Sequence, residues 1–174
     1  MSRPWGIDGL LAGAMICLVF WGCGYRFAGS NPLPFGLTQI HIRLLENRSS
    51  ETGAEVVLTN RLIEEFVRRR QVPVEEEAAA AAVLSGTLAS LSTQATSRQA
   101  RGGAAQRELG ITLRMQLKNA QGQTLWQDSN ISDSETYTVV SGDPSATEQN
   151  RRQALDTLAQ RLAETVYQRM TEDF

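Results

Sequence analysis

Histidine, cysteine and lysine are scarce in this chain of 174 residues. It has one histidine, His41, and two cysteines, Cys17 and Cys23, which both lie near the start. The rest of the chain therefore cannot form a disulfide framework or a cysteine-based metal site, and it offers little for catalysis by histidine. Lys118 is the only lysine among 17 basic residues, and the net charge of -2 argues against a protein dedicated to nucleic-acid binding.

Long apolar runs are also missing, except for Leu10–Trp21 near the start. As a helix, these residues would rise about 18 Å, well short of the roughly 30 Å hydrocarbon core of a membrane. A run of this length after Arg3 is typical of the apolar region of a signal peptide. It ends at Gly22–Cys23, and a small residue before a cysteine resembles a bacterial lipobox. We therefore expect residues 1–22 to be a lipoprotein signal peptide, with Cys23 as the acylated residue.

An uncleaved membrane anchor is the alternative, because the charge-free stretch continues from residue 9 to residue 25. Phe20 also stands where a lipobox usually has leucine. The lipoprotein interpretation is favoured because it gives Cys23 a role. The glycines and prolines of the next segment favour an irregular linker, so residues 23–36 are predicted to be a lipidated tether.

Two later segments have the period of amphipathic helices. The first begins with the capping-box pattern Thr52–Glu55 and continues to about Arg70. The second begins with the similar pattern Ser145–Glu148 and continues to about Met170. Their predicted apolar stripes are Val56, Leu62, Ile63, Phe66 and Val67 in the first, and Leu155, Leu158, Leu162 and Val166, flanked by Ala154, Ala159 and Ala163, in the second.

Strands are predicted where apolar and polar residues alternate. The clearest is Glu108–Lys118, which is followed by a hairpin turn at Asn119–Gly122. An acid-free loop, Thr93–Arg107, precedes it. The other predicted strands are Leu37–Leu45, Val83–Leu91, and a last strand in two pieces, Thr124–Ser132 and Thr136–Val140.

The element order β-α-β-β-β-α predicts a single domain over residues 37–174. Each predicted helix has one apolar stripe, and the strands alternate, so the simplest layering places both helices on one face of the sheet. We therefore expect an α/β fold of the α+β sandwich type, with a four-stranded mixed sheet and two amphipathic helices on one face. The other face of the sheet should be uncovered and polar.

Catalytic motifs are absent from the sequence. It has no glycine-rich phosphate loop, no serine nucleophile elbow and no acidic cluster with metal-ligand spacing. We therefore expect no enzyme, no cofactor and no metal.

Basic residues gather in and beside the acid-free loop. Arg114 and Lys118 are four residues apart on a predicted strand, so they share one face. Together with the loop arginines they could bind an anionic, phosphorylated ligand. The alternative is a loop whose charges only keep the protein soluble. The candidate ligand-binding residues are Arg98, Arg101, Arg107, Arg114 and Lys118.

Nearly all of the chain after residue 22 resembles the LptE family of lipopolysaccharide-assembly lipoproteins. The combination of Cys23–Phe27 with Glu46–Arg48 at this distance is the most specific part of the match. The other matching segments are Leu33–Pro34, Gly36, Leu58–Leu62, Phe66, Val83–Gly86, Leu109–Leu117, Gly122–Trp126 and Leu155–Arg169.

This resemblance implies a lipoprotein on the periplasmic side of the cell outer membrane, held there by the lipid on Cys23. It would occupy the lumen of the LptD β-barrel and assist the delivery of lipopolysaccharide to the outer leaflet. The family fold is two helices on a four-stranded sheet, and Arg98 and Arg101 fall where the family is expected to contact lipopolysaccharide. A periplasmic lipoprotein scaffold for another envelope assembly is the alternative function.

Overall fold

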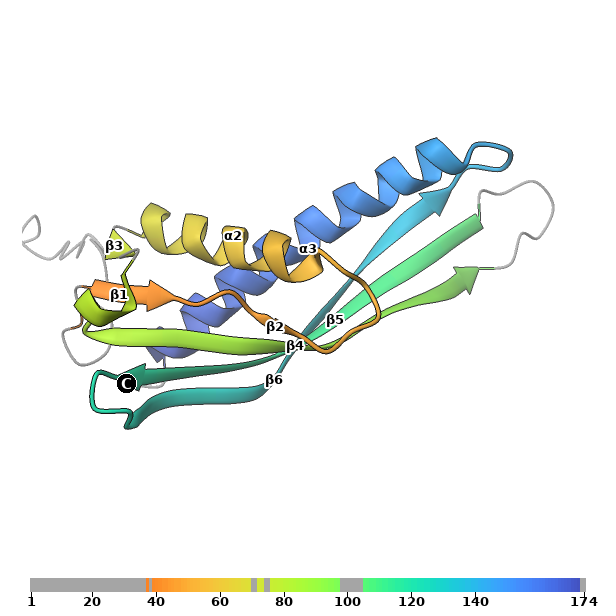
Figure 1. The fold of residues 1–174 in the computed structure, drawn as a ribbon. Helices are drawn as coiled ribbons and strands as arrows, with labels where there is room; N and C mark the ends of the chain where they lie inside the picture. The colour runs from red at the N-terminus through yellow and green to blue at the C-terminus, as the bar shows by residue number, and fades with distance from the viewer. Residues whose placement is uncertain (1–36, 38, 70–71, 74–75, 98–104, 173–174) are drawn as a thin grey trace, which may run out of the picture.

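The computed structural model describes residues 37–172 apart from 38, 70–71, 74–75 and 98–104. In this part of the chain, a six-stranded sheet carries two helices on one face (Figure 1). The elements are β1 (Gln39–Ile42), β2 (Glu46–Asn47), α2 (Ala54–Arg68), β3 (Val72–Pro73), the short 3-10 helix η2 (Glu77–Ala79), β4 (Ala82–Ser97), β5 (Ala105–Asn119), β6 (Thr124–Val139) and α3 (Pro144–Glu172).

The sheet is mixed, with strand order β3-β1-β4-β5-β6. The long strands β4, β5 and β6 are antiparallel, whereas the short strands β1 and β2 lie parallel to β4 along its other edge. The predicted α+β architecture, a mixed sheet with both helices packed against it, is confirmed. The two-residue strands β2 and β3 are additions that were not predicted, because two residues carry no alternation.

Helix α2 begins differently from the predicted capping box. Its N-cap residue is Gly53, which has a φ of 95° and makes no side-chain cap. The left-handed backbone at this position favours glycine. In a capping box, the glutamate accepts a hydrogen bond from the N–H of the N-cap residue. Glu55 does so here, since its Oε2 accepts a hydrogen bond of 2.9 Å from the Gly53 N–H.

The predicted apolar stripe of α2 is partly wrong. Leu62 and Phe66 are buried, but Val56 and Val67 are 45% and 56% exposed. The buried face of the helix is rotated toward Leu58 and Thr59, which face the sheet. A similar shift occurs after β1. Continued alternation along the predicted strand Leu37–Leu45 would bury Leu44 together with Ile40 and Ile42. The strand ends at Ile42 instead, so Leu45 is buried and Leu44 is exposed.

Helix α3 begins at Pro144, one residue before the predicted start. The Asp143 carboxylate accepts a hydrogen bond of 2.9 Å from the Ala146 N–H, so Asp143 caps the helix in place of Ser145. Proline suits the first helical position because it needs no hydrogen-bond partner for its nitrogen. All seven residues of the predicted seam and its alanine flanks are buried. No helix among the described residues is long and apolar enough to cross a membrane.

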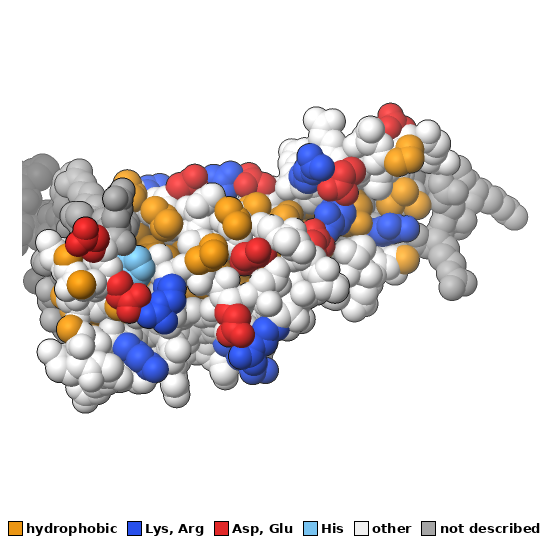
Figure 2. All heavy atoms as spheres, in the orientation of Figure 1, with side chains coloured by type: hydrophobic (Ala, Val, Ile, Leu, Met, Phe, Trp, Pro, Cys, Tyr) orange, Lys and Arg blue, Asp and Glu red, His pale blue; other side chains and the backbone are white. Residues whose placement is uncertain are grey.

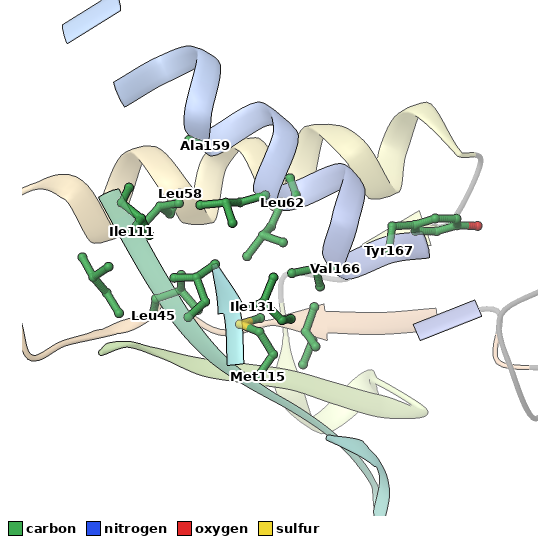
Figure 3. Packing of buried hydrophobic residues seen from close by; sticks show 14 of the residues in the cluster. Leu45, Leu58, Leu62, Ile111, Met115, Ile131, Ala159, Val166 and Tyr167 are labelled. Carbon is green, nitrogen blue, oxygen red and sulfur yellow. The ribbon is translucent and has the colours of Figure 1, made fainter. Parts of the chain in front are cut away.

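The core lies between the two helices and the helix-facing side of the sheet. Leu58 and Leu62 of α2 and Val166 of α3 point toward Ile111 and Met115 of β5 (Figure 3). Tyr167 packs edge-on against Phe66, with ring centroids 5.3 Å apart, and so joins the two helices. Burial of these apolar side chains stabilises the packing of the two helices on the sheet.

The described parts of the predicted loop Thr93–Arg107, residues 93–97 and 105–107, are strand. β4 continues to Ser97 and β5 begins at Ala105, and the ladder pairs Thr93 with Leu109 and Ala95 with Arg107. These residues are small or polar, so the alternation of apolar and polar side chains that predicts a strand is missing. The last strand, predicted in two pieces, is likewise one continuous strand.

Candidate functional site

The sheet face opposite the helices carries polar side chains. Along β5, Leu113, Met115 and Leu117 point into the core, so the residues between them point to the other face. That face bears hydroxyl and amide groups together with a few charged ones, and no described helix covers it (Figure 1). Across the three long strands its members include Ser85, Thr87, Ser90, Ser92, Glu108, Thr112, Arg114, Gln116, Lys118, Gln127, Ser132 and Ser134.

Arg114 and Lys118 share this open polar face, as the sequence predicted. Arg114 is exposed and pairs with Thr87 in the ladder, while Lys118 is half-buried and pairs with Val83. At about 3.3 Å per residue, their Cα atoms lie roughly 13 Å apart along β5. This spacing suits a ligand that is extended along the strand or carries two anionic groups.

Arg107 lies apart from this pair. It is exposed, but it has the same position in the alternation as Leu109, so it belongs to the helix-facing side of β5. It is about 23 Å along the strand from Arg114. Arg98, Arg101 and Cys23 lie outside the described residues. The structure thus brings Arg114 and Lys118 together on one face and separates Arg107 from them.

The three described candidates differ from the other cations in their electrostatic partners. Within the described ranges, Arg107, Arg114 and Lys118 form no ion pair with an acid. Every other arginine in this part of the chain forms an ion pair with an acid. These arginines are Arg43, Arg48, Arg61, Arg68, Arg69, Arg151, Arg152, Arg161 and Arg169. On the face shown in Figure 2, most charged side chains lie beside one of the opposite sign.

Two adjoining grooves run over the open face. The first has a volume of about 510 Å³ and is lined by Arg114, Thr87 and Leu44 among others. The second has a volume of about 680 Å³ and is lined by Lys118 and Val83. Both grooves share Arg43, Ser85 and Gln116. Each unpaired cation of this face therefore borders a groove with hydrogen-bonding side chains.

The acids that line these grooves are already neutralised by arginines. Glu77 holds Arg43 at 2.6 Å, and Arg48 hydrogen-bonds to Glu46 and lowers the pKa of that carboxyl. Burial alone would raise the pKa of Asp128, but the Asn130 N–H and Arg169 outweigh it, so this pKa is also lowered. Because each of these acids is paired with an arginine, Arg114 and Lys118 are the charges left to meet an anion.

The arrangement combines cations with hydroxyl and amide groups, which are groups that form hydrogen bonds with anions. No group of three or more potential metal ligands occurs in the described part of the chain. Arg43 and the groove amide Gln116 were not among the predicted site residues. Alternation along the predicted strand Leu37–Leu45 puts Arg43 on the face opposite Ile40 and Ile42. Its pairing with Glu77, 34 residues away, could not be predicted from that pattern.

Comparisons with known proteins identify a family and a similar fold. The LptE family, described as lipopolysaccharide-assembly, matches residues 37–170. No curated protein matches the chain. Among solved structures, the rare lipoprotein B from Shewanella oneidensis is 18% identical, with a TM-score of 0.53 over 78% of this chain and 95% of that one. A minor lipoprotein from Acinetobacter baumannii is 11% identical, with a TM-score of 0.52 over 79% and 92%. At these identities the two structures support the fold alone.

Proposed function

This chain belongs to the LptE lipopolysaccharide-assembly family, a non-catalytic family, and from that membership we propose that it is a lipid-anchored lipoprotein of the outer membrane. In this proposal residues 1–22 are removed as a signal peptide, Cys23 carries the lipid and residues 23–36 tether the domain. The domain occupies the lumen of an LptD-like β-barrel from the periplasmic side and binds lipopolysaccharide there.

The observation that carries the binding proposal is the set of cations without an acidic partner. Every other described arginine is neutralised by an acid, whereas Arg107, Arg114 and Lys118 are not. Phosphate groups accept charge-assisted hydrogen bonds from such side chains, and arginine can contact them with two N–H groups. Arg98 and Arg101 are further proposed contacts for lipopolysaccharide. The polar open face is also compatible with the polar interior of a β-barrel.

Charge reversal on the open face tests lipopolysaccharide binding. Arg114→Glu should weaken binding by about tenfold at low ionic strength, which corresponds to about 1.4 kcal/mol, and salt should reduce the difference because exposed charges are screened. Arg152→Glu is the matched control, since Arg152 is exposed on α3 at the other side of the molecule. Equal affinities of the two variants would contradict the site assignment.

Co-purification tests the partner. A large β-barrel protein should accompany the full-length chain when membranes are dissolved in a mild detergent. If the chain instead accompanies a different envelope assembly, the alternative of a lipoprotein scaffold replaces the barrel proposal.

A further inference from the structure

The edge of β4 that faces away from β5 is paired with other strands along only about half of its length. β1 pairs with β4 at Ala82–Leu84 and β2 pairs with it at Thr87–Leu88. Beyond Leu88, no strand among the described residues lies against this edge, and β4 continues to Ser97 as a border of the sheet (Figure 1). Residues 89–97 therefore form an open edge about 30 Å long at roughly 3.3 Å per residue.

The backbone groups that face this open edge follow from the ladder. The carbonyls of Leu84 and Leu88 accept hydrogen bonds from the Arg43 and Arg48 N–H groups, so both point away from β5. A bulge at Ala89 shifts the register by one residue. Because facing directions alternate in an antiparallel ladder, the outward residues after the bulge are Leu91, Thr93 and Ala95, and the inward ones are Ser90, Ser92 and Gln94.

The opposite edge of the sheet is protected. β6 carries Asp128, Asp133 and Glu135, and arginines of α3 form ion pairs with all three acids. Arg161 forms an ion pair of 2.7 Å with Asp133 and also donates a hydrogen bond of 2.7 Å to the Ser134 backbone carbonyl. Charges and a covered backbone are the features by which proteins prevent an edge strand from pairing with another chain.

The open edge of β4 lacks these protective features. Residues 89–97 contain no charged residue and no proline. The side chains of Ser90 and Ser92 are exposed, and Leu91 is half-buried beside the core. The contrast with β6 indicates an edge that is kept open for a strand, because the same sheet blocks its other edge with acids and arginines.

We propose that residues 89–97 of β4 accept an extended segment of the barrel partner as an added strand. This inference rests on the proposed function, which supplies a partner that makes further contacts elsewhere. The backbone groups of Leu91, Thr93 and Ala95 would pair with that segment, and Leu91 would favour an uncharged side chain opposite it. A second copy of this chain fits less well, since a ladder of at most nine residues is short for a stable homodimer, whose interface buries about 1,200 Å² or more.

Residue-resolved amide hydrogen exchange on the full-length lipoprotein, alone and with its barrel partner, tests this inference. In the isolated chain, the Ser92 and Gln94 amides should be protected by β5, whereas those of Leu91, Thr93 and Ala95 should exchange freely. In the complex, the exchange of these three amides should slow by at least about tenfold, since each would gain a hydrogen bond.

The possible outcomes separate this inference from the proposed function. A complex in which the three amides still exchange freely overturns the added strand and leaves the barrel role intact. Failure to form any complex overturns both. Protection of the three amides already in the isolated chain, or a dimer at high concentration, overturns the inference in favour of pairing within or between copies of this chain.

A proline variant gives a second test. Thr93→Pro removes an N–H that faces the open edge and bonds to nothing in β5, so the melting temperature should change little while recovery of the partner falls at least about threefold. Thr93→Ala keeps that N–H and is the matched control. Equal recovery with both variants, each shown to be folded, would overturn the inference.

Discussion

A Cβ atom placed on Gly86 would lie 2.7 Å from the backbone carbonyl oxygen of Arg114 on the neighbouring strand. It would also overlap the Met115 sulfur, so both the backbone and the core oppose a side chain here. The close approach of β4 and β5 at this point holds Arg114 at the border of the first groove. The stability of the core and the placement of the candidate site therefore depend on the same glycine.

Replacing Gly86 with alanine should destabilise the fold. The backbone contact cannot be relieved by rotating a side chain, so we expect a loss of about 1–3 kcal/mol in the free energy of unfolding, measured by urea denaturation. Gly110→Ala is the control, because its Cβ would meet only the Ser92 hydroxyl, at 3.3 Å. Equal stabilities of the two variants would contradict the close packing of β4 on β5.

The buried hydroxyl of Thr59 should contribute measurably to stability. It accepts a hydrogen bond of 3.1 Å from the buried Leu45 N–H and donates one of 2.6 Å to the Glu55 carbonyl. Thr59→Val keeps the shape but leaves the Leu45 N–H without a partner, which should cost about 1–3 kcal/mol. Thr59→Ser keeps the hydroxyl and should lose less, and a reversed order in thermal unfolding would contradict this role.

Acid should destabilise the protein partly through Asp128. The pKa of this carboxyl is lowered in the folded state, below the value of about 3.9 expected in the unfolded chain. The stability it contributes is therefore complete above about pH 5 and is lost as the pH falls through the folded-state pKa. Asp128→Asn should flatten the decline in unfolding free energy between pH 5 and about pH 2.5. Parallel curves for wild type and variant would rule out this contribution.

Cys23 should carry the only stable membrane anchor. Several acyl chains hold a protein firmly at a membrane, whereas a single chain binds marginally. Cys23→Ala should therefore accumulate as an uncleaved precursor, and the intact mass of the wild-type protein should show acylation and the loss of residues 1–22. Finding residues 1–22 still attached to the wild-type protein would contradict the lipoprotein interpretation.

Arg98 and Arg101 should contribute to lipopolysaccharide binding without supporting the fold. Replacing both with glutamate should leave the melting temperature nearly unchanged and weaken binding in a salt-sensitive way, because the phosphates of lipid A are anionic. The measurement is lipopolysaccharide affinity at low ionic strength. Unchanged affinity would remove both residues from the site and would leave the barrel role standing.

The sequence predicted best those elements that bury a regular stripe. Leu155, Leu158, Leu162 and Val166 of α3 repeat at helical spacing, and all four are buried. The end of β4 was missed for the opposite reason, since Thr93–Ser97 bury no continuous face and leave no periodic signal. The rotation of α2 could not be predicted either, because Leu58 and Val56 are both apolar and only packing against the sheet distinguishes them.

Part of the arrangement of the candidate cations followed from the sequence. Arg114 and Lys118 share a face because four residues separate them on a strand. The position of Arg107 was readable in the same way, since it precedes the buried Leu109 by two residues. Which cations lack an acidic partner could not be predicted, because pairs such as Arg61 with Asp156 join residues 95 apart in the sequence.

The strand order has a consequence for the sequence of events in folding. β4, β5, β6 and α3 each contact the element that precedes or follows them in the sequence. β1 pairs with β4 although the whole of α2 lies between these two strands in the sequence. Contacts between near neighbours form faster, because less chain entropy is lost in closing short loops. We therefore expect the antiparallel strands β4, β5 and β6 and helix α3 to assemble first and β1 to dock last. Since β1 follows the proposed tether directly, the part of the domain nearest to the lipid would be the last to close.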